Sequence, residues 1–218
     1  MDDPRVLLNL AGIKRDIVVI GASAGGVLAL QRLFAALPVC FSATVGVVLH
    51  RGDRLSLLAS VLGRHSSLPI IEPRDGELVR QGTIYLAPAD HHMLFHNGYI
   101  ALVQGSKENS TRPAIDILFR SAAAGYRQRV VGVLLTGYGE DGVRGMTAIA
   151  EGGGICVVQD PQEAEMPHMP LNAIRCGAVC GVFALDDMAP ALGDLARGQQ
   201  IKSRDPRGEE HNASGTKA

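Results

Sequence analysis

Three side chains that together can activate a hydroxyl group stand at the ends of predicted strands: Ser23, His50 and Asp141. The turn over residues 21–25 reads G-A-S-A-G and matches the G-x-S-x-G pattern, in which a sharp strand-to-helix bend presents a serine hydroxyl. Serine is a weak nucleophile until a base takes its proton and a third group orients that base. His50 and Asp141 have the residue types for these two roles, so the sequence predicts a serine hydrolase site.

The same turn has a second interpretation, as a dinucleotide-binding loop. The G-x-G-x-x-G fingerprint needs a middle glycine for close approach of a pyrophosphate, and an acidic residue about 20 positions later for the ribose. Here Ser23 replaces that glycine, and His50 and Arg51 stand where the acid is expected. Because an arginine there favours a 2′-phosphate, an NADP-dependent oxidoreductase stays open as an alternative.

Each of the three residues also has a purely structural interpretation. A small residue such as Ser23 at a tight turn often caps the following helix by accepting its free N–H groups. His50 could equally cap its strand, and Asp141 is an acid of the kind that a helix dipole favours in the first turn. The serine hydrolase interpretation therefore depends on the fold bringing all three together.

Apolar segments rich in Val and Ile alternate with segments of helical period, which predicts strand, helix, strand, helix. The strands are continuously apolar, as in a parallel sheet covered by helices, so we expect an α/β doubly wound, mainly parallel sheet with helices on both faces. In such a sheet the carboxyl ends of the strands face one crevice. If the strand at 130–135 lies beside the strand at 17–20, Asp141 enters the crevice that holds Ser23 and His50. The predicted strands are 17–20, 44–49, 130–135 and 155–158, and the predicted helices are 27–37, 55–62, 143–150 and a later short one.

An antiparallel hairpin is expected around residues 92–104, after a strand at 83–87. Asn97 and Gly98 tolerate positive φ and suit a two-residue turn between strands at 92–96 and 99–104. Pro113 is placed to occupy the first turn of a helix through 118–124, with Gly125 near its end.

The chain has 218 residues and is expected to hold one catalytic domain, at residues 15–196. Residues 197–218 are polar and contain one large aliphatic side chain, Ile201, so we expect a mobile, disordered tail.

The net charge of −1 gives no footprint for nucleic acid or an anionic membrane surface. The longest apolar stretch, residues 17–30, is too short to span a bilayer, and Asp2 and Asp3 do not resemble the start of a secretory signal. Four sparse cysteines fit the cytoplasm.

Histidines and cysteines do not suggest a metal site. Cys176 and Cys180 lack the paired spacing of a zinc site, and the sequence predicts buried thiols there. The histidines at 91, 92 and 96 divide between the faces of a hairpin, and Asp90 alone does not complete a ligand set. No metal and no cofactor are expected.

Several motifs occur in an order that resembles the catalytic domain of bacterial chemotaxis protein-glutamate methylesterases. They cover residues 15–196 and are the GASAGG turn at 21–26, a histidine ending the second strand, YLAPADHHM at 85–93, RPAIDILF at 112–119, LTGYGEDG at 135–142 and the Met169-Pro170 pair. The resemblance implies a serine hydrolase that removes methyl esters from glutamates on cytoplasmic helices of chemoreceptors, and that often deamidates receptor glutamines. It also implies Ser23 as the nucleophile, His50 as the base and Asp141 as the acid that orients it.

The chain departs from the family's usual pattern in ways that bear on regulation and substrate contacts. A receiver domain usually precedes the catalytic domain, whereas only about 15 residues precede the first predicted strand here, so we expect a separate regulatory chain or no regulation. Tyr138, Thr111 and Ala24 stand where Met, His and Thr are common.

The remaining site predictions concern groups that contact substrate. For the developing oxyanion we expect the N–H of Ala24 and one N–H from the loop 137–139 as donors, and Arg112 as a substrate-side contact. A non-catalytic adaptor that only binds receptor helices stays open as a third interpretation.

Overall fold

The structure is a computed structural model, and it describes residues 5–8, 12–50, 57–204 and 206. In this part of the chain, nine strands form one sheet in the order β1-β12-β11-β10-β9-β2-β3-β6-β4, and three more form a small sheet in the order β5-β8-β7. The strands are β1 (Arg5–Leu8), β2 (Ile17–Ala22), β3 (Thr44–Leu49), β4 (Ile70–Ile71), β5 (Glu77–Leu78), β6 (Ile84–Leu86), β7 (His92–His96), β8 (Tyr99–Val103), β9 (Val130–Leu134), β10 (Ile155–Gln159), β11 (Gly181–Phe183) and β12 (Ile201–Arg204).

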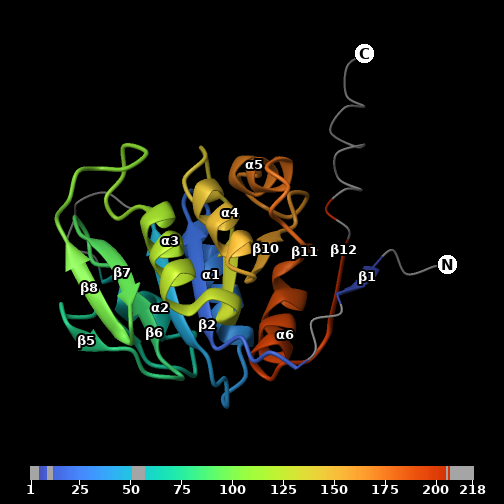
Figure 1. Ribbon diagram of the computed structural model, residues 1–218, viewed down its shortest axis with the longest axis horizontal. Coiled ribbons are helices and arrows are strands. Elements are labelled where there is room, and N and C mark those ends of the chain that lie inside the picture. The colour runs from blue at the N-terminus through green and yellow to red at the C-terminus, as the bar shows by residue number, and fades with distance from the viewer. Residues whose placement is uncertain (1–4, 9–11, 51–56, 205, 207–218) are drawn as a thin grey trace.

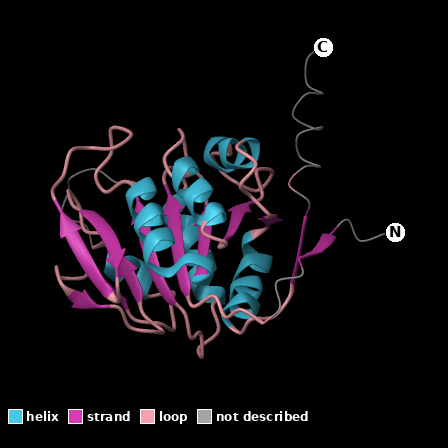
Figure 2. Cartoon of the chain, viewed as in Figure 1, coloured by secondary structure: helices cyan, strands magenta, loops and turns pink. Residues whose placement is uncertain are grey.

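Helices cover both faces of the main sheet (Figures 1 and 2). They are α1 (Gly26–Ala36), α2 (Leu58–Gly63), α3 (Ile115–Tyr126), α4 (Val143–Glu151), α5 (His168–Arg175) and α6 (Leu185–Ala196). Two apolar cores result, one between the sheet and α1, α2 and α6, the other between the sheet and α3, α4 and α5. The predicted α/β doubly wound fold is confirmed, with parallel pairing from β4 to β11.

The central strands are apolar on both faces because helices cover both. Every residue of β2, β3 and β9 is buried. In α1 the buried side chains fall at helical spacing, at Ala29, Leu30, Leu33 and Phe34. The helix ends at Ala36 because Leu37 precedes Pro38 and takes extended backbone angles, with ψ at 135°.

The predicted strand order is also confirmed: β2 lies between β3 and β9. The loops that follow these three strands therefore open at the same edge of the sheet. These are the loops that carry Ser23, His50 and Asp141.

The predicted hairpin is confirmed as β7 and β8, which pair antiparallel. Asn97 and Gly98 both have positive φ, at 48° and 88°. The hairpin does not extend the main sheet, because β8 pairs with β5 on its other side and β7 packs against α3. In Figure 1 this small sheet lies beyond β6, on the side away from β1 and β12.

Several predicted boundaries need correction. Pro113 lies before α3 rather than in its first turn, whereas Gly125 lies near the end of that helix, as predicted. The predicted helix at 55–62 is observed as α2 from Leu58, and residues 55 and 56 lie outside the described residues. Two helices, α5 and α6, follow β10, where one short helix was predicted.

The segment after residue 196 differs from the predicted tail where the structure describes it. Residues 201–204 form β12, which pairs with β1 and contacts β11. Ile201 and Ser203 are buried, and Arg204 forms an ion pair with the buried Asp160. A segment with a single aliphatic side chain, in which buried and exposed residues alternate, can therefore form a strand when the edge of a sheet is available for pairing. Residues 205 and 207–218 lie outside the described residues.

We expect Gly145→Ala to destabilise the fold, because a Cβ at this position in α4 would lie 2.4 Å from Cβ of Phe119 in α3. Alanine is the better helix former, but its methyl group would overlap an atom next to the α3 backbone, and the two helices would have to move apart. We therefore expect the free energy of unfolding to fall by about 1–3 kcal/mol. Urea unfolding measures it. The control is Gly63→Ala at the end of α2, where no atom lies within 4 Å of the added methyl; equal stability of the two variants would contradict the prediction.

Candidate functional site

The serine turn is held in shape by its own backbone and by the neighbouring strand. Ser23 follows β2 directly, and its N–H donates to the carbonyl of Thr136 at 3.0 Å. Its carbonyl accepts the N–H of Gly26 at 2.9 Å, and Gly25 takes a φ of 76°. A Cβ on Gly26 would lie 2.6 Å from the side chain of Leu49. Glycine at these two positions therefore permits the sharp bend and the close packing of α1 on the sheet.

Thr136 fixes the far side of this turn. Its buried hydroxyl donates to the carbonyl of Ala24 at 3.0 Å and accepts the N–H of Met166 at 2.8 Å. Its own N–H donates to the side-chain oxygen of Gln159 at 2.9 Å. One threonine thus ties the serine turn, the loop after β9 and the loop before α5 together.

His50 and Asp141 are in direct contact. Nε2 of His50 lies 2.7 Å from Oδ2 of Asp141, across the end of β2. The backbone N–H of His50 donates to the carbonyl of Ala22 at 3.0 Å, which places the imidazole beside the serine turn. With Nε2–H donated to the carboxylate, Nδ1 is the ring atom with a lone pair that can take a proton.

Ser23 and His50 line one cavity of about 310 Å³ at this edge of the sheet. Its other lining residues come from the start of α1, the end of β3 and the start of α2, and are mainly apolar: Gly25, Gly26, Val27, Leu28, Leu49 and Leu58. Leu28 is 64% exposed although it is a leucine in the first turn of a helix. The hydroxyl and the imidazole therefore face a small apolar hollow that is open to solvent.

The Asp141 carboxylate is buried and fully hydrogen-bonded. Burial alone would raise its pKa, but hydrogen bonds from His50 and from the N–H groups that begin α3 outweigh this and lower its pKa. The carboxylate therefore carries its charge at neutral pH. Its five donors are His50 Nε2 (2.7 Å), Ile115 N (2.7 Å), Asn109 Nδ2 (2.9 Å), Asp116 N (3.0 Å) and Thr111 Oγ1 (3.2 Å).

A second buried carboxylate mirrors the first. Asp116, in the first turn of α3, accepts the N–H groups of Gly142 at 3.0 Å and Gly145 at 2.7 Å, at the start of α4. Asp141, just before α4, accepts the first N–H groups of α3. Each helix thus begins against a carboxylate supplied by the other. Burial, together with the charge of Asp141, raises the pKa of Asp116.

The loop after β9 supplies part of the rim. The N–H of Gly137 donates to Met166 at 2.9 Å, so within 137–139 the N–H groups of Tyr138 and Gly139 are the ones that can serve an oxyanion. Tyr138 is 55% exposed, and its ring stacks on His168 with centroids 4.9 Å apart. Its role and that of Ala24 stay predictions.

Arg112 is engaged with the protein itself. Its Nε donates to Asp90 at 2.9 Å, and Nη1 donates to the carbonyl of Gly105 at 2.5 Å. The first bond holds the segment before α3 against the loop before β7, and the second lies within the segment between β8 and α3. A contact from Arg112 to substrate remains a prediction.

Metal ligands are not assembled in the described residues, where no three His, Cys, Asp or Glu side chains are placed to hold an ion. His91 and His92 bond instead to the carbonyls of Ala89 and Ser106, each at 3.0 Å. Cys156 is buried, but Cys176 is exposed, so the prediction of a buried thiol at 176 is wrong because α5 ends there at the surface. None of the described helices is both long and apolar enough to cross a membrane.

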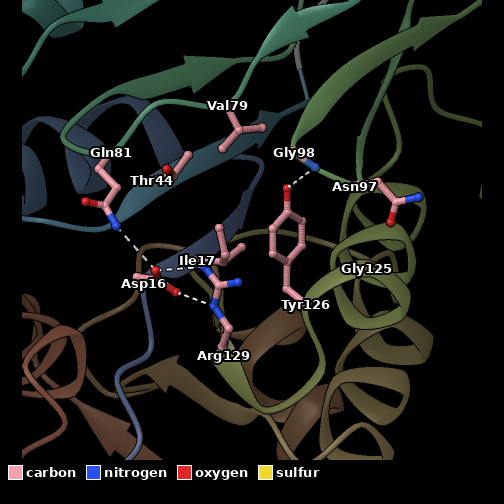
Figure 3. Close-up of a pocket in the computed structure, with 10 residues that line it drawn as sticks. All are labelled: Asp16, Ile17, Thr44, Val79, Gln81, Asn97, Gly98, Gly125, Tyr126 and Arg129. Carbon is pink, nitrogen blue, oxygen red and sulfur yellow. Dashed lines mark hydrogen bonds and ion pairs between the residues drawn. The ribbon is translucent and has the colours of Figure 1, made fainter.

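A second cavity, of about 420 Å³, lies at the opposite, amino-terminal edge of the sheet. Figure 3 shows Asp16 in contact with Arg129 and Gln81, and Tyr126 reaching the N–H of Gly98. None of the residues predicted for the site lines this cavity. The chemistry-bearing residues are all at the carboxyl edge.

Sequence reasoning missed four residues that organise the site: Asn109, Asp116, Thr136 and Gln159. Asp116 had a usable signal, since it is an acid in the first turn of a predicted helix and lies inside the RPAIDILF motif. Thr136 likewise lies inside the LTGYGEDG motif. Asn109 and Gln159 had no signal, because the partners of their side chains are 7 to 32 residues away in the chain.

We expect Asp141→Asn to lower the free energy of unfolding at pH 7 by about 3 kcal/mol. The N–H and O–H groups that now donate to a buried carboxylate would then face a neutral amide, one end of which is itself a donor. The folded pKa of Asp141 lies below its ordinary value of 3.8. The carboxylate's contribution is therefore present above pH 3.8 and is lost as the pH falls through the folded pKa. Urea unfolding should therefore show a smaller difference in the free energy of unfolding between variant and wild type at pH 3 than at pH 7.

Asp194→Asn is the matched control, because the Asp194 side chain is 38% exposed and forms an ion pair with Arg197, three residues later. It should change stability by less than about 0.5 kcal/mol. An Asp141→Asn gap that stays constant with pH would contradict the ionised state assigned to Asp141.

Comparisons with known proteins identify the family of the chain. The family model described as CheB methylesterase matches residues 18–192. A protein of Leptospira interrogans provisionally named a protein-glutamate methylesterase/protein-glutamine glutaminase is 35% identical over 176 residues, covering 80% of this chain and 91% of its own. Protein-glutamate methylesterase/protein-glutamine glutaminase 2 of Anaeromyxobacter dehalogenans is 37% identical, over 84% of this chain and 54% of its own.

A solved structure shares the fold. The crystal structure of the Thermotoga maritima CheB methylesterase catalytic domain superposes with a TM-score of 0.80 at 33% identity, over 84% of this chain and all of that one. Sequence and fold therefore lead to one conclusion: the chain belongs to the CheB methylesterase family.

Proposed function

We propose that this protein is a protein-glutamate methylesterase that hydrolyses glutamyl methyl esters on the cytoplasmic helices of chemoreceptors, with Ser23, His50 and Asp141 as its catalytic triad. The observation that carries the proposal is the 2.7 Å contact between His50 and Asp141, at the ends of the two strands that flank the Ser23 strand. Residues 91 positions apart meet there because the sheet order places them there.

The reaction follows from the roles of the three side chains. Nδ1 of His50 takes the hydroxyl proton as Oγ of Ser23 attacks the ester carbonyl. The tetrahedral intermediate collapses, the bond to methoxide breaks, and His50 returns the proton so that methanol leaves. Water then attacks the acyl-enzyme with His50 again as base, releasing glutamate and free Ser23. Asp141 stabilises the imidazolium in both steps and holds the tautomer.

The negative oxygen of each tetrahedral intermediate needs N–H donors. Ala24, at the turn into α1, would supply one of them, and Tyr138 or Gly139 would supply the other from the loop after β9. Each donor of this kind typically lowers the barrier by about 3 kcal/mol. The Thr136 bond to the carbonyl of Ala24 fixes the peptide plane next to the first donor.

The cavity beside Ser23 suits an ester carried on an aliphatic side chain. Val27, Leu28 and Leu58 offer apolar contacts to the methylene groups and to the methyl group, while the open side faces the surface from which a receptor helix would approach. The same attack on a glutamine side chain would release ammonia, so we also propose glutaminase activity. Because these receptor helices are cytoplasmic, we propose that the enzyme acts in the cytoplasm. We also propose that a separate chain regulates it.

The two alternative functions are less well supported. In a dinucleotide site the end of β3 would contact the ribose, whereas His50 stands there bonded to Asp141. Family membership likewise favours a hydrolase over an NADP-dependent oxidoreductase. A non-catalytic adaptor would have no use for an imidazole held 2.7 Å from a buried carboxylate and lining the same cavity as a serine.

Ser23→Ala should reduce methanol release from methylated receptor by at least about 1000-fold, because the nucleophile is lost while the turn keeps its backbone. Circular dichroism checks the fold. In the wild type, a serine-directed acylating reagent should label Ser23, which mass spectrometry locates, and His50→Gln should slow the labelling. His65→Gln serves as the control because His65 is an exposed histidine that follows α2 and does not line the cavity beside Ser23. Unchanged methanol release by Ser23→Ala would remove the serine mechanism.

A further inference from the structure

Asn109 lies between the two buried carboxylates. Its side-chain nitrogen is 2.9 Å from Oδ1 of Asp141 and 3.0 Å from Oδ2 of Asp116. A carboxamide nitrogen carries two hydrogens, so it can donate one to each carboxylate at the same time. The opposite orientation of the amide would aim its oxygen at two anions, so the chemistry of the neighbours fixes the assignment.

The backbone around Asn109 is built to aim this side chain. Glu108 and Thr111 exchange both backbone hydrogen bonds, at 3.1 and 2.9 Å, which closes a two-residue turn. The turn residues Asn109 and Ser110 both have positive φ, at 50° and 64°. A turn of this hand requires such angles, and asparagine accepts them more readily than most residues.

Other charged groups surround the pair without separating the two carboxylates. Arg120 of α3 forms a two-bond ion pair with Glu108 at 2.5 and 2.8 Å, and its charge also acts on Asp116 and Asp141. His50 faces Asp141 from the end of β3, and His92 of β7 acts on Glu108. Asn109 is the neutral side chain that bridges the two anions.

We propose that Asn109 is a positioning residue of the catalytic site: by donating one hydrogen to each carboxylate it keeps Asp116 and Asp141 ionised together, so that Asp141 remains the anion that His50 requires. This inference depends on the proposed function, since it assigns a role toward the triad. The N–H groups of Ile115 and Asp116 already orient the Asp141 carboxylate. The role left for Asn109 is to offset the repulsion between two like charges buried at the facing starts of α3 and α4.

Without these hydrogens, the carboxylate pair should bind a proton at a higher pH. The burial that raises the pKa of Asp116 and the lost donor to Asp141 act in the same direction. As the pH is lowered, activity should then be lost at a higher pH than in the wild type. The reason is that a proton on the carboxylate pair removes negative charge from the group that faces His50. At alkaline pH, where both carboxylates are ionised, much of the activity should return.

Two variants test this while respecting the positive φ at position 109. Asn109→Gly removes the side chain, and Asn109→Asp keeps its shape but replaces the donor by a third carboxylate. The readout is the rate at which a serine-directed acylating reagent labels Ser23 between pH 5 and 9, supported by methanol release from methylated receptor. Asn97→Gly and Asn97→Asp are the controls, since Asn97 has a φ of 48° in the β7–β8 turn, outside the site.

We expect the acid limb of the labelling profile to move up by about one pH unit in Asn109→Gly and further in Asn109→Asp, with labelling at pH 7 reduced about tenfold. The Asn97 variants should match the wild type. Thermal unfolding at pH 8 establishes that the variants are folded. If Asn109→Gly does not fold, the Asn109→Asp profile alone decides.

A lower rate with an unmoved pH midpoint would show a merely structural role and overturn the proposal, as would wild-type profiles in both variants. In either case wild-type labelling at Ser23 would leave the proposed function standing. If the wild type is not labelled at Ser23 and Ser23→Ala keeps full methanol release, the triad itself fails and this inference fails with it.

Discussion

The site depends on keeping one negative charge inside the protein. Asp141 is 3% exposed, and a carboxylate so buried is tolerated only if its oxygens are hydrogen-bonded. The fold meets this condition by ending a Gly-rich loop against the start of α3, where the first N–H groups of a helix have no partner of their own. The anion therefore stabilises a helix start, and the hydrogen bonds from that helix start, together with the one from His50, outweigh burial and lower the pKa of the Asp141 carboxyl. Structure and chemistry make the same demand on this carboxylate.

The parallel sheet meets the second requirement, which is proximity. Three strands that are neighbours in space but distant in sequence end at one edge, and the loop after β9 reaches over the end of β2 to place Asp141 against His50. Glycines allow the close approaches this needs. A Cβ on Gly137 would lie 2.7 Å from Cβ of Ser23 and 2.1 Å from Sδ of Met169, so the loop can lie against Ser23 only with no side chain there.

Sequence reasoning predicted the parts that have a local cause. Continuous apolar strands, the G-A-S-A-G turn and the Asn97-Gly98 hairpin each carry their signal within a few residues, and the order β3-β2-β9 follows from the usual rules for such sheets. The parts that could not be predicted are set by partners far along the chain. From the sequence, Asn109 resembles any loop residue, and its role becomes visible only when the fold places Asp116 and Asp141 on either side of it. Residues 201–204 likewise resemble a polar tail until the fold provides the edge of β11 for pairing. Cys176 is wrongly predicted to be buried, because no local signal in the sequence shows that the end of α5 is exposed to solvent.

The backbone bonds around Thr136 and Gly137 have a mechanical consequence. Gly137 donates to Met166 and accepts from Met169, while Thr136 bonds both Met166 and the turn that carries Ser23. The start of α5 is thereby fastened to the turn that carries Ser23 by a continuous chain of short bonds. Substitutions on the solvent side of α5 can then reshape this surface of the molecule without displacing Ser23, whereas a push along the axis of that helix would be transmitted directly to it.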